Sequence, residues 1–138
     1  MTPRSPAEVI LARVDAFQEA DFGFIFDTYH SQSAFRQQFT ERDDYIRFGW
    51  ASLGKDFRIL KCRIVAEDDG PREARVIYFM ELDVNGEFKS YAELTWLWWE
   101  ENAWRCHRSQ KIETDDLPCP PDQLDFQTFE NFEPKVIF

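Results

Sequence analysis

The chain has 138 residues, which is enough for one domain with a substantial core but not for two of ordinary size. Hydrophobic residues make up 43% of the sequence and aromatic residues 17%, which excludes a disordered chain. The formal charge of −10 is spread along the sequence, so we expect neither nucleic acid nor an anionic membrane as a partner, because both normally require a basic patch.

The first predicted helix lies within residues 5–20. Ser5 is its predicted N-cap, Pro6 takes the first helical position and Glu8 completes a capping box. The apolar residues that follow fall on one helical stripe: Ile10, Val14 and Phe17.

Two further helices are predicted before residue 56. One follows the cap residue Asp21 and is weakened by Gly23, and its apolar residues at helical spacing are Phe22, Ile25, Phe26 and Tyr29. The other runs from Thr40 to Gly54, because glycine suits the left-handed backbone that often follows a helix.

From Phe57 onward the hydrophobic pattern alternates. Four strands are predicted, at about 57–66, 74–84, 87–99 and 104–112. Asn85 and Gly86 tolerate a positive φ and predict a tight hairpin between two of them. Helices followed by an antiparallel meander indicate an α+β domain over residues 1–116, with the helices packed on one side of a curved sheet.

Residues 117–138 are acidic and contain several Pro and Phe residues, so we expect an extended C-terminal arm. No apolar run approaches the roughly twenty residues of a membrane helix, and no secretory signal is visible, which predicts a cytoplasmic protein. Cys62, Cys106 and Cys119 lack the spacing of a zinc site or a disulfide framework, so neither a metal nor another cofactor is expected.

The order of elements, ending in "NAWRCHRSQ", resembles the nuclear transport factor 2-like superfamily (the SnoaL or ketosteroid isomerase-like fold). Within it the chain is most similar to the YchJ-type domain, over residues 7–112. The residues that match the motifs of that domain are Arg13, Ala16, Phe17, Thr28, His30, Glu93 and Trp104. The resemblance implies a cone-shaped α+β fold with helices on the concave face of the sheet, but no reaction. The flanking zinc-binding SEC-C motifs of YchJ-type proteins are absent, so no metal-dependent role is implied.

The hairpin loops predict which side chains share a face of the sheet. The loop at Asn85 and Gly86 and the loop "EENA" together predict four cross-strand pairs: Tyr78–Glu93, Trp99–Trp104, Thr95–Arg108 and Glu93–Gln110. A bulge of one residue in either loop would exchange the two faces, because side chains alternate with a period of two.

One of these faces is apolar with a few convergent polar groups, a combination typical of a small-molecule site, and we assign it to the concave side beneath the helices. The predicted ligand-pocket residues are Tyr78, Glu93, Arg108, Gln110, Thr28 and His30. Glu93 is either a satisfied structural group or a functional one, which would be a ligand anchor or a general base with Tyr78 or His30 as its acid partner. Thr28 and His30 are interpreted first as a helix end, and a place for His30 in the pocket is the alternative.

The opposite face carries large apolar side chains that would form a wide exposed patch on a monomer. We therefore predict a homodimer through this face, with the interface residues Trp96, Trp98, Leu94 and Phe79. The competing explanation is that the chain's own C-terminal residues cover the face, through Phe126, Phe129, Phe132 and Phe138.

Three functions remain open from the sequence. The first is a small-ligand-binding or partner-binding module, the second is an isomerase- or dehydratase-type enzyme that uses Glu93 as general base, and the third is a structural or regulatory homodimer. A polar cavity around Glu93 would favour the first two, and a filled interior would favour the third.

Overall fold

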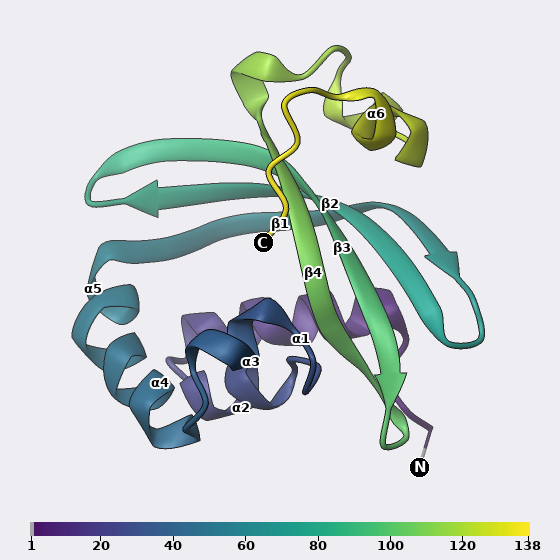
Figure 1. The fold of residues 1–138 in the computed structure, drawn as a ribbon. Helices are drawn as coiled ribbons and strands as arrows, with labels where there is room; N and C mark the ends of the chain where they lie inside the picture. Colours follow the sequence, from purple (N-terminus) through teal and green to yellow (C-terminus); the bar gives the residue numbers. More distant parts are fainter. Residues whose placement is uncertain (1) are drawn as a thin grey trace.

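The first helix forms as its capping residues predict. In the computed structural model, which describes residues 2–138, α1 (Pro6–Gln18) begins at a capping box. The Glu8 amide donates to Ser5 Oγ at 3.2 Å, and the Ser5 amide donates to Glu8 Oε1 at 2.8 Å. These bonds satisfy amide groups that a helix start otherwise leaves unpaired, and α1 runs beneath the sheet (Figure 1).

The rest of the helical region has more pieces than the two predicted. They are α2 (Phe22–Asp27), α3 (Ala34–Gln38), α4 (Arg42–Phe48), a π-helical turn (Gly49–Leu53) and α5 (Gly54–Asp56). Helix α3 was not predicted, although Ser33 caps it by accepting from the Arg36 amide. The predicted left-handed conformation of Gly54 is wrong, since its φ of −68° is helical and the chain continues into α5.

All four predicted strands are present, extended by a few residues. They are β1 (Phe57–Asp69), β2 (Glu73–Val84), β3 (Glu87–Glu100) and β4 (Ala103–Glu113), and they form one antiparallel sheet in the order β1-β2-β3-β4. Asn85 and Gly86 have φ values of 54° and 87° and form the predicted two-residue turn. The predicted pairing of Tyr78 with Glu93 is confirmed.

A bulge between β3 and β4 changes the other half of the predicted register. Trp99 faces Trp104 as expected, but Trp96 pairs with Arg108 while its neighbour Leu97 pairs with Cys106. One extra residue therefore lies in β4 beside His107, and beyond it the faces exchange. The predicted pairs Thr95–Arg108 and Glu93–Gln110 are wrong, and the observed pairs are Thr95–Ser109 and Glu93–Lys111.

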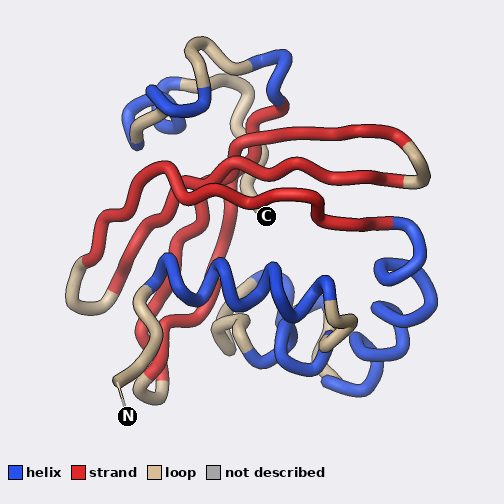
Figure 2. The backbone as a smooth tube through the Cα atoms, turned by 180° about the vertical axis from the view of Figure 1, so that it is seen from behind, coloured by secondary structure: helices blue, strands red, loops and turns tan. Residues whose placement is uncertain are grey.

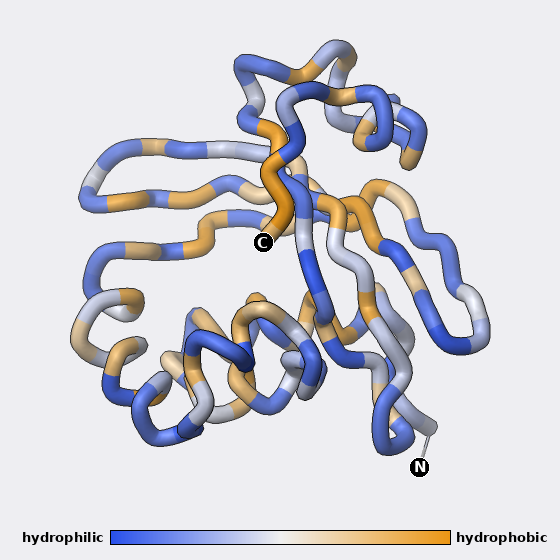
Figure 3. Tube along the Cα trace, in the orientation of Figure 1, coloured by the Kyte–Doolittle hydropathy of each residue, from blue (hydrophilic) through white to orange (hydrophobic). Residues whose placement is uncertain are grey.

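The side of the sheet that faces the helices holds the first core cluster. Its sheet residues pack against Val9 and Ile10 of α1 and include Val76, Tyr78, Met80, Leu97 and Cys106. Apolar segments of strands and helices face each other across this layer (Figure 3). The structure is thus a two-layer α+β fold with a curved antiparallel sheet (Figures 1 and 2).

The C-terminal segment is not the extended arm that its composition predicted. It contains a 3-10 turn (Thr114–Asp116), a second one (Pro121–Gln123) and α6 (Phe126–Asn131), and it lies on the side of the sheet away from the helices (Figures 1 and 2). Its residues Leu124 and Phe129 form a second core cluster with four sheet residues, Ile77, Ala92, Leu94 and Ile112. Asp125 caps α6, which favours a turn of helix where a fully extended chain was expected.

The C-terminal segment packs on the side of the sheet that was predicted to form a homodimer interface. Leu94 is 2% exposed within a single chain, and Phe79 and Trp96 are partly buried against the same cluster. The chain's own C-terminal segment therefore covers much of the apolar surface from which the dimer was predicted. A homodimer stays a prediction, but exposure of this face no longer supports it.

Two separate segments cover the free edge of β4. Tyr29 forms a parallel bridge to Cys106, with the His30 amide donating to the Cys106 carbonyl at 2.9 Å and the Cys106 amide donating to the Thr28 carbonyl at 2.8 Å. Beyond the bulge, Ser109 and Phe138 exchange backbone hydrogen bonds of 2.7 and 2.9 Å. Both bridges satisfy edge groups that would otherwise face solvent.

Gln110 anchors the C-terminal segment to the sheet, and we expect Gln110→Leu to lower the free energy of unfolding by about 1–3 kcal/mol. Gln110 is 2% exposed and its amide donates to the Phe129 carbonyl at 2.9 Å, so leucine leaves that carbonyl buried without a donor. Urea unfolding measures the loss. The exposed residue Gln37 gives the control, and a Gln37→Leu change as large as that of Gln110→Leu would contradict this role.

Candidate functional site

A cavity of about 190 Å³ lies between the helical layer and the end of the sheet nearest β4. Most of its lining comes from α1, from the segment around α3 and from strands β3 and β4. The lining residues are Arg13, Tyr29, Ala34, Phe35, Gln38, Glu93, Thr95, Cys106, His107, Arg108, Ser109 and Phe138. A second cavity of about 180 Å³ lies between α1 and strands β1 to β3 and shares Arg13, Tyr29 and Glu93 with the first.

Glu93 belongs to a chain of hydrogen bonds on the helix-facing side of the sheet. The Tyr78 hydroxyl donates to Glu93 Oε2, and it lies 2.8 Å from Thr95 Oγ1. Thr95 Oγ1 in turn lies 2.8 Å from Ser109 Oγ. The predicted contact between Glu93 and Tyr78 is present, and Ser109 takes the place that was expected for Arg108 because of the bulge.

Burial raises the pKa of the Glu93 carboxyl above its ordinary value. The hydrogen bond from Tyr78 and the positive charges of Arg13 and Lys111 oppose this rise by favouring the carboxylate. Burial also raises the pKa of the Tyr78 phenol, and the neighbouring Glu93 charge adds to it, so Tyr78 stays protonated and acts as the donor. Glu93 is therefore a carboxyl group whose proton is held more tightly than usual and which lines both cavities.

Arg13 projects from α1 into the same interior. Its Nη1 donates to Thr28 Oγ1 at 2.5 Å and its Nη2 donates to the Tyr29 hydroxyl at 3.1 Å. In the part of the chain that the structure describes, no carboxylate oxygen lies within 4.0 Å of its guanidinium nitrogens. The cavity thus presents a permanent positive charge whose contacts in the chain are neutral.

The sequence named Arg13 only as a family position and did not place it in the site. The sequence does indicate that the Arg13 side chain faces the interior, because residue 13 falls on the stripe of Ile10, Val14 and Phe17 at helical spacing. An arginine on the buried stripe of a helix is unusual unless it has a partner there. Ser109 and Lys111 were missed because the bulge was not predicted.

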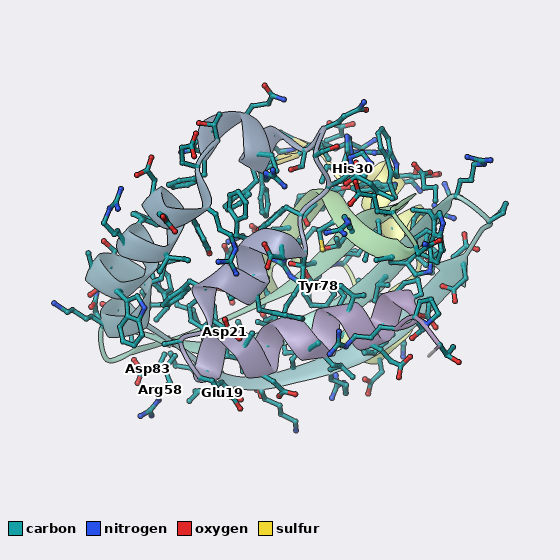
Figure 4. All side chains as sticks on the ribbon, turned by 90° about the horizontal axis from the view of Figure 1, so that it is seen from below. Glu19, Asp21, His30, Arg58, Tyr78 and Asp83 are labelled. Carbon is teal, nitrogen blue, oxygen red and sulfur yellow. The ribbon has the colours of Figure 1, made fainter. Side chains whose placement is uncertain are left out.

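Thr28 and His30 do different things in the structure. Thr28 is buried, accepts from Arg13 and follows the end of α2, as the helix-end interpretation predicts, but it is not part of the lining of either cavity. His30 is buried elsewhere: its Nε2 lies 3.6 Å from Glu100 Oε2, and its ring packs edge-to-face on Trp98. Figure 4 shows Tyr78 under the helices near the middle of the sheet and His30 away from it.

Two other predicted pocket residues lie with the outer side of the sheet. Gln110 is bonded to the C-terminal segment, and the Arg108 guanidinium lies over the Trp96 ring, 4.5 Å from its centroid. Arg108 borders the cavity as well. His107 stacks on Trp98 with ring centroids 3.5 Å apart, and burial together with the Arg108 charge lowers its pKa.

Residues 2–138 contain no cluster of three or more His, Cys, Asp or Glu side chains that could hold a metal ion. The three cysteines are free, and burial raises the pKa of the Cys62 thiol to about 12. Within the same residues, no helix is long and apolar enough to cross a membrane.

We expect Glu93→Gln to be more stable than the wild type at about pH 7 and to lose that advantage near pH 4. The raised pKa means that the folded protein holds the Glu93 proton more tightly than the unfolded chain does. Stabilisation by this proton is complete below the ordinary value of 4.5 and is lost as the pH rises through the raised pKa. Glutamine keeps an acceptor for Tyr78 and carries no charge.

Urea unfolding at several pH values from 4 to 8 measures this difference, with the exposed Glu130→Gln as control. If Glu93→Gln were less stable than the wild type throughout this range, Glu93 would stabilise the fold as a carboxylate, contrary to this prediction.

Comparison with known proteins bears on the fold. A SEC-C motif containing protein from Rhodopseudomonas palustris has a similar structure, with a TM-score of 0.64 and 15% sequence identity over 82% of this chain and 83% of that one. The intermembrane space region of the chloroplast protein ARC6 aligns over 81% of this chain and 100% of that one, at a TM-score of 0.44 and 10% identity. No protein-family model and no curated protein matches the sequence. The chain therefore shares its α+β fold with a SEC-C motif protein.

Proposed function

We propose that this chain is a nuclear transport factor 2-like domain of the YchJ type that binds a small molecule in the cavity beside Glu93. The observation that carries the proposal is the presence of Arg13, from α1, and Glu93, from β3, in the lining of one cavity without an ion pair between them. Buried charged groups are normally paired, so two that remain apart and line a cavity suit a ligand that contacts both. The helices on one side of the curved sheet support the superfamily assignment, and we propose a cytoplasmic location.

The experiment blocks the cavity from its rim. Ala34 is exposed and lines the cavity, whereas Gln37 lies on the same helix and does not line it. Ala34→Trp, Gln37→Trp and the wild type are purified from the source organism and compared by native mass spectrometry. We expect a retained small molecule on the wild type and on Gln37→Trp, and none on Ala34→Trp. Equal retention by all three, or by none, would contradict binding in this cavity.

A second candidate function is favoured by the contact between Tyr78 and Glu93. A general base or acid works best with a pKa shifted toward the operating pH, and burial moves the Glu93 pKa in that direction. The domain would then be an isomerase- or dehydratase-type enzyme with Glu93 as base. In that case Glu93→Gln abolishes turnover of the bound molecule while the molecule is still retained, whereas a purely binding role predicts no turnover by the wild type.

A further inference from the structure

Resting on the proposed function, we infer that the ligand is a small organic monocarboxylate with a flat apolar body, whose carboxylate binds Arg13. The first reason is the state of the Arg13 side chain. Its guanidinium has five N–H donors, and in residues 2–138 only Thr28 and the Tyr29 hydroxyl accept from it. Planar guanidinium groups match carboxylates through two parallel hydrogen bonds, which two neutral hydroxyls do not replace.

The second reason is the cost of leaving this charge without a counter-ion. A guanidinium that is held inside a protein is expensive unless it is paired. Glu93 is the acidic residue in the cavity lining, but it is not within 4.0 Å of Arg13, and Tyr78 already donates to its Oε2. An anion that enters the cavity provides the missing partner.

The charge of the lining favours a single negative charge over two. Arg13 and Arg108 line the cavity together with Glu93, and Lys111 is close enough to lower the Glu93 pKa. Arg108 already lies 4.0 Å from Glu73 Oε2, so a monoanion pairs one-to-one with Arg13, the positive charge of the lining that has no acidic partner in residues 2–138. A phosphate dianion would place a second negative charge beside Glu93 inside a chain whose formal charge is already −10.

The apolar part of the lining determines the shape of the ligand's body. The Tyr29 ring stacks on Phe35 with centroids 3.8 Å apart and has the Arg13 guanidinium 4.6 Å from its centroid, so its faces are occupied, and Phe35, Phe138 and Cys106 supply the rest of the apolar lining. Aromatic walls favour flat groups that stack on them. The cavity volume of about 190 Å³ lies below the roughly 300–1,000 Å³ of sites for drug-sized molecules, so the ligand is small.

The polar groups of the lining favour a hydrogen-bond donor on the ligand as well. Glu93, Thr95 and Ser109 line the cavity together, and Tyr78 and Thr95 both donate to the same Glu93 oxygen, Oε2. A hydroxyl group on the ligand's ring would donate to the other Glu93 oxygen, Oε1. The ligand class is therefore a small hydroxy-substituted aromatic acid, and 4-hydroxybenzoate is a suitable probe.

The experiment compares 4-hydroxybenzoate with its neutral analogue 4-hydroxybenzamide by isothermal titration calorimetry and by amide NMR shifts. We expect the acid to bind the wild type, the amide to bind at least about tenfold more weakly, and Arg13→Met to lose about tenfold or more in affinity for the acid. Arg58→Gln removes one positive charge from an exposed side chain outside the cavity and should leave the affinity unchanged. If Arg13→Met does not fold, the affinity of Arg13→Lys for the acid is measured instead. Lysine keeps the charge but not the planar pair of donors, so the acid should bind this variant more weakly than the wild type.

The outcomes separate this inference from the proposed function. Equal affinities for the acid and the amide, with NMR shifts at Thr95 and Ser109, would overturn the carboxylate assignment and leave ligand binding in the cavity intact. Binding of neither probe would also overturn it, whereas the cavity itself is judged by the ligand retained on the wild type and lost from Ala34→Trp. An acid affinity that falls equally in Arg13→Met and Arg58→Gln would show that net charge alone is responsible.

Discussion

Phe129→Ala should lower the free energy of unfolding by about 3–5 kcal/mol, a large part of the stability of a domain of this size. The Phe129 side chain is fully buried between α6 and the outer side of the sheet, where it packs with Ile77, Leu94 and Leu124. Alanine removes most of its contacts and leaves a cavity that the short C-terminal segment can close only in part. Chemical unfolding followed by tryptophan fluorescence measures the loss.

The same variant tests what covers the outer side of the sheet. Loosening of α6 exposes Ile77 and Leu94, so sedimentation equilibrium should show more self-association in Phe129→Ala than in the wild type. Phe88 is 64% exposed on β3, and Phe88→Ala is the matched control with an expected change within about 0.5 kcal/mol. A wild-type dimer that dissociates in Phe129→Ala would instead place this residue at a subunit interface and restore the predicted homodimer.

Phe22→Ala should cost a similar amount, about 3–5 kcal/mol, on the other side of the molecule. Phe22 is 1% exposed and lies edge-to-face with three rings, those of Phe17, Tyr45 and Trp50. It ties α1, α2 and α4 together in the helical layer, which supplies one wall of the cavity. We expect the loss of stability to be accompanied by loss of the retained ligand.

The close approach of Gly49 to the Phe22 ring can be tested by adding a methyl group at residue 49. A Cβ atom at residue 49 would lie 2.4 Å from Phe22 Cγ, so Gly49→Ala alone should destabilise the protein by about 1–3 kcal/mol through overpacking. In the Phe22→Ala background the ring is gone and the same change should cost much less. A double-mutant cycle from urea unfolding measures the difference, and additive effects would contradict a direct clash.

Local signals in the sequence were sufficient for much of the sheet. The turn at Asn85 and Gly86 fixes the register of β2 and β3, and this placed Tyr78 beside Glu93 correctly. The capping box at Ser5 located the start of α1 for the same reason, since both features depend on residues that are close in the chain. Contacts of this kind need no knowledge of the tertiary structure.

The errors came from features that depend on distant packing. The bulge beside His107 has no glycine to mark it, and it moves Gln110 to the outer side, where the Phe129 carbonyl receives its amide. Helix α3 is five residues long and has little pattern of its own. The role of Arg13 required the position of the segment at Thr28, which follows from the bridge to β4.

Phe138 has two positions of interest at once: it lines the cavity, and its bridge to Ser109 covers the edge of β4. Separation of the two backbone hydrogen bonds between Ser109 and Phe138 would uncover a donor and an acceptor on an edge strand. Uncovered edges are templates on which a strand from another chain can add. Each time this bridge opens, the edge of β4 could pair with a strand of a second molecule. A bound ligand that holds Phe138 in place would therefore act against aggregation.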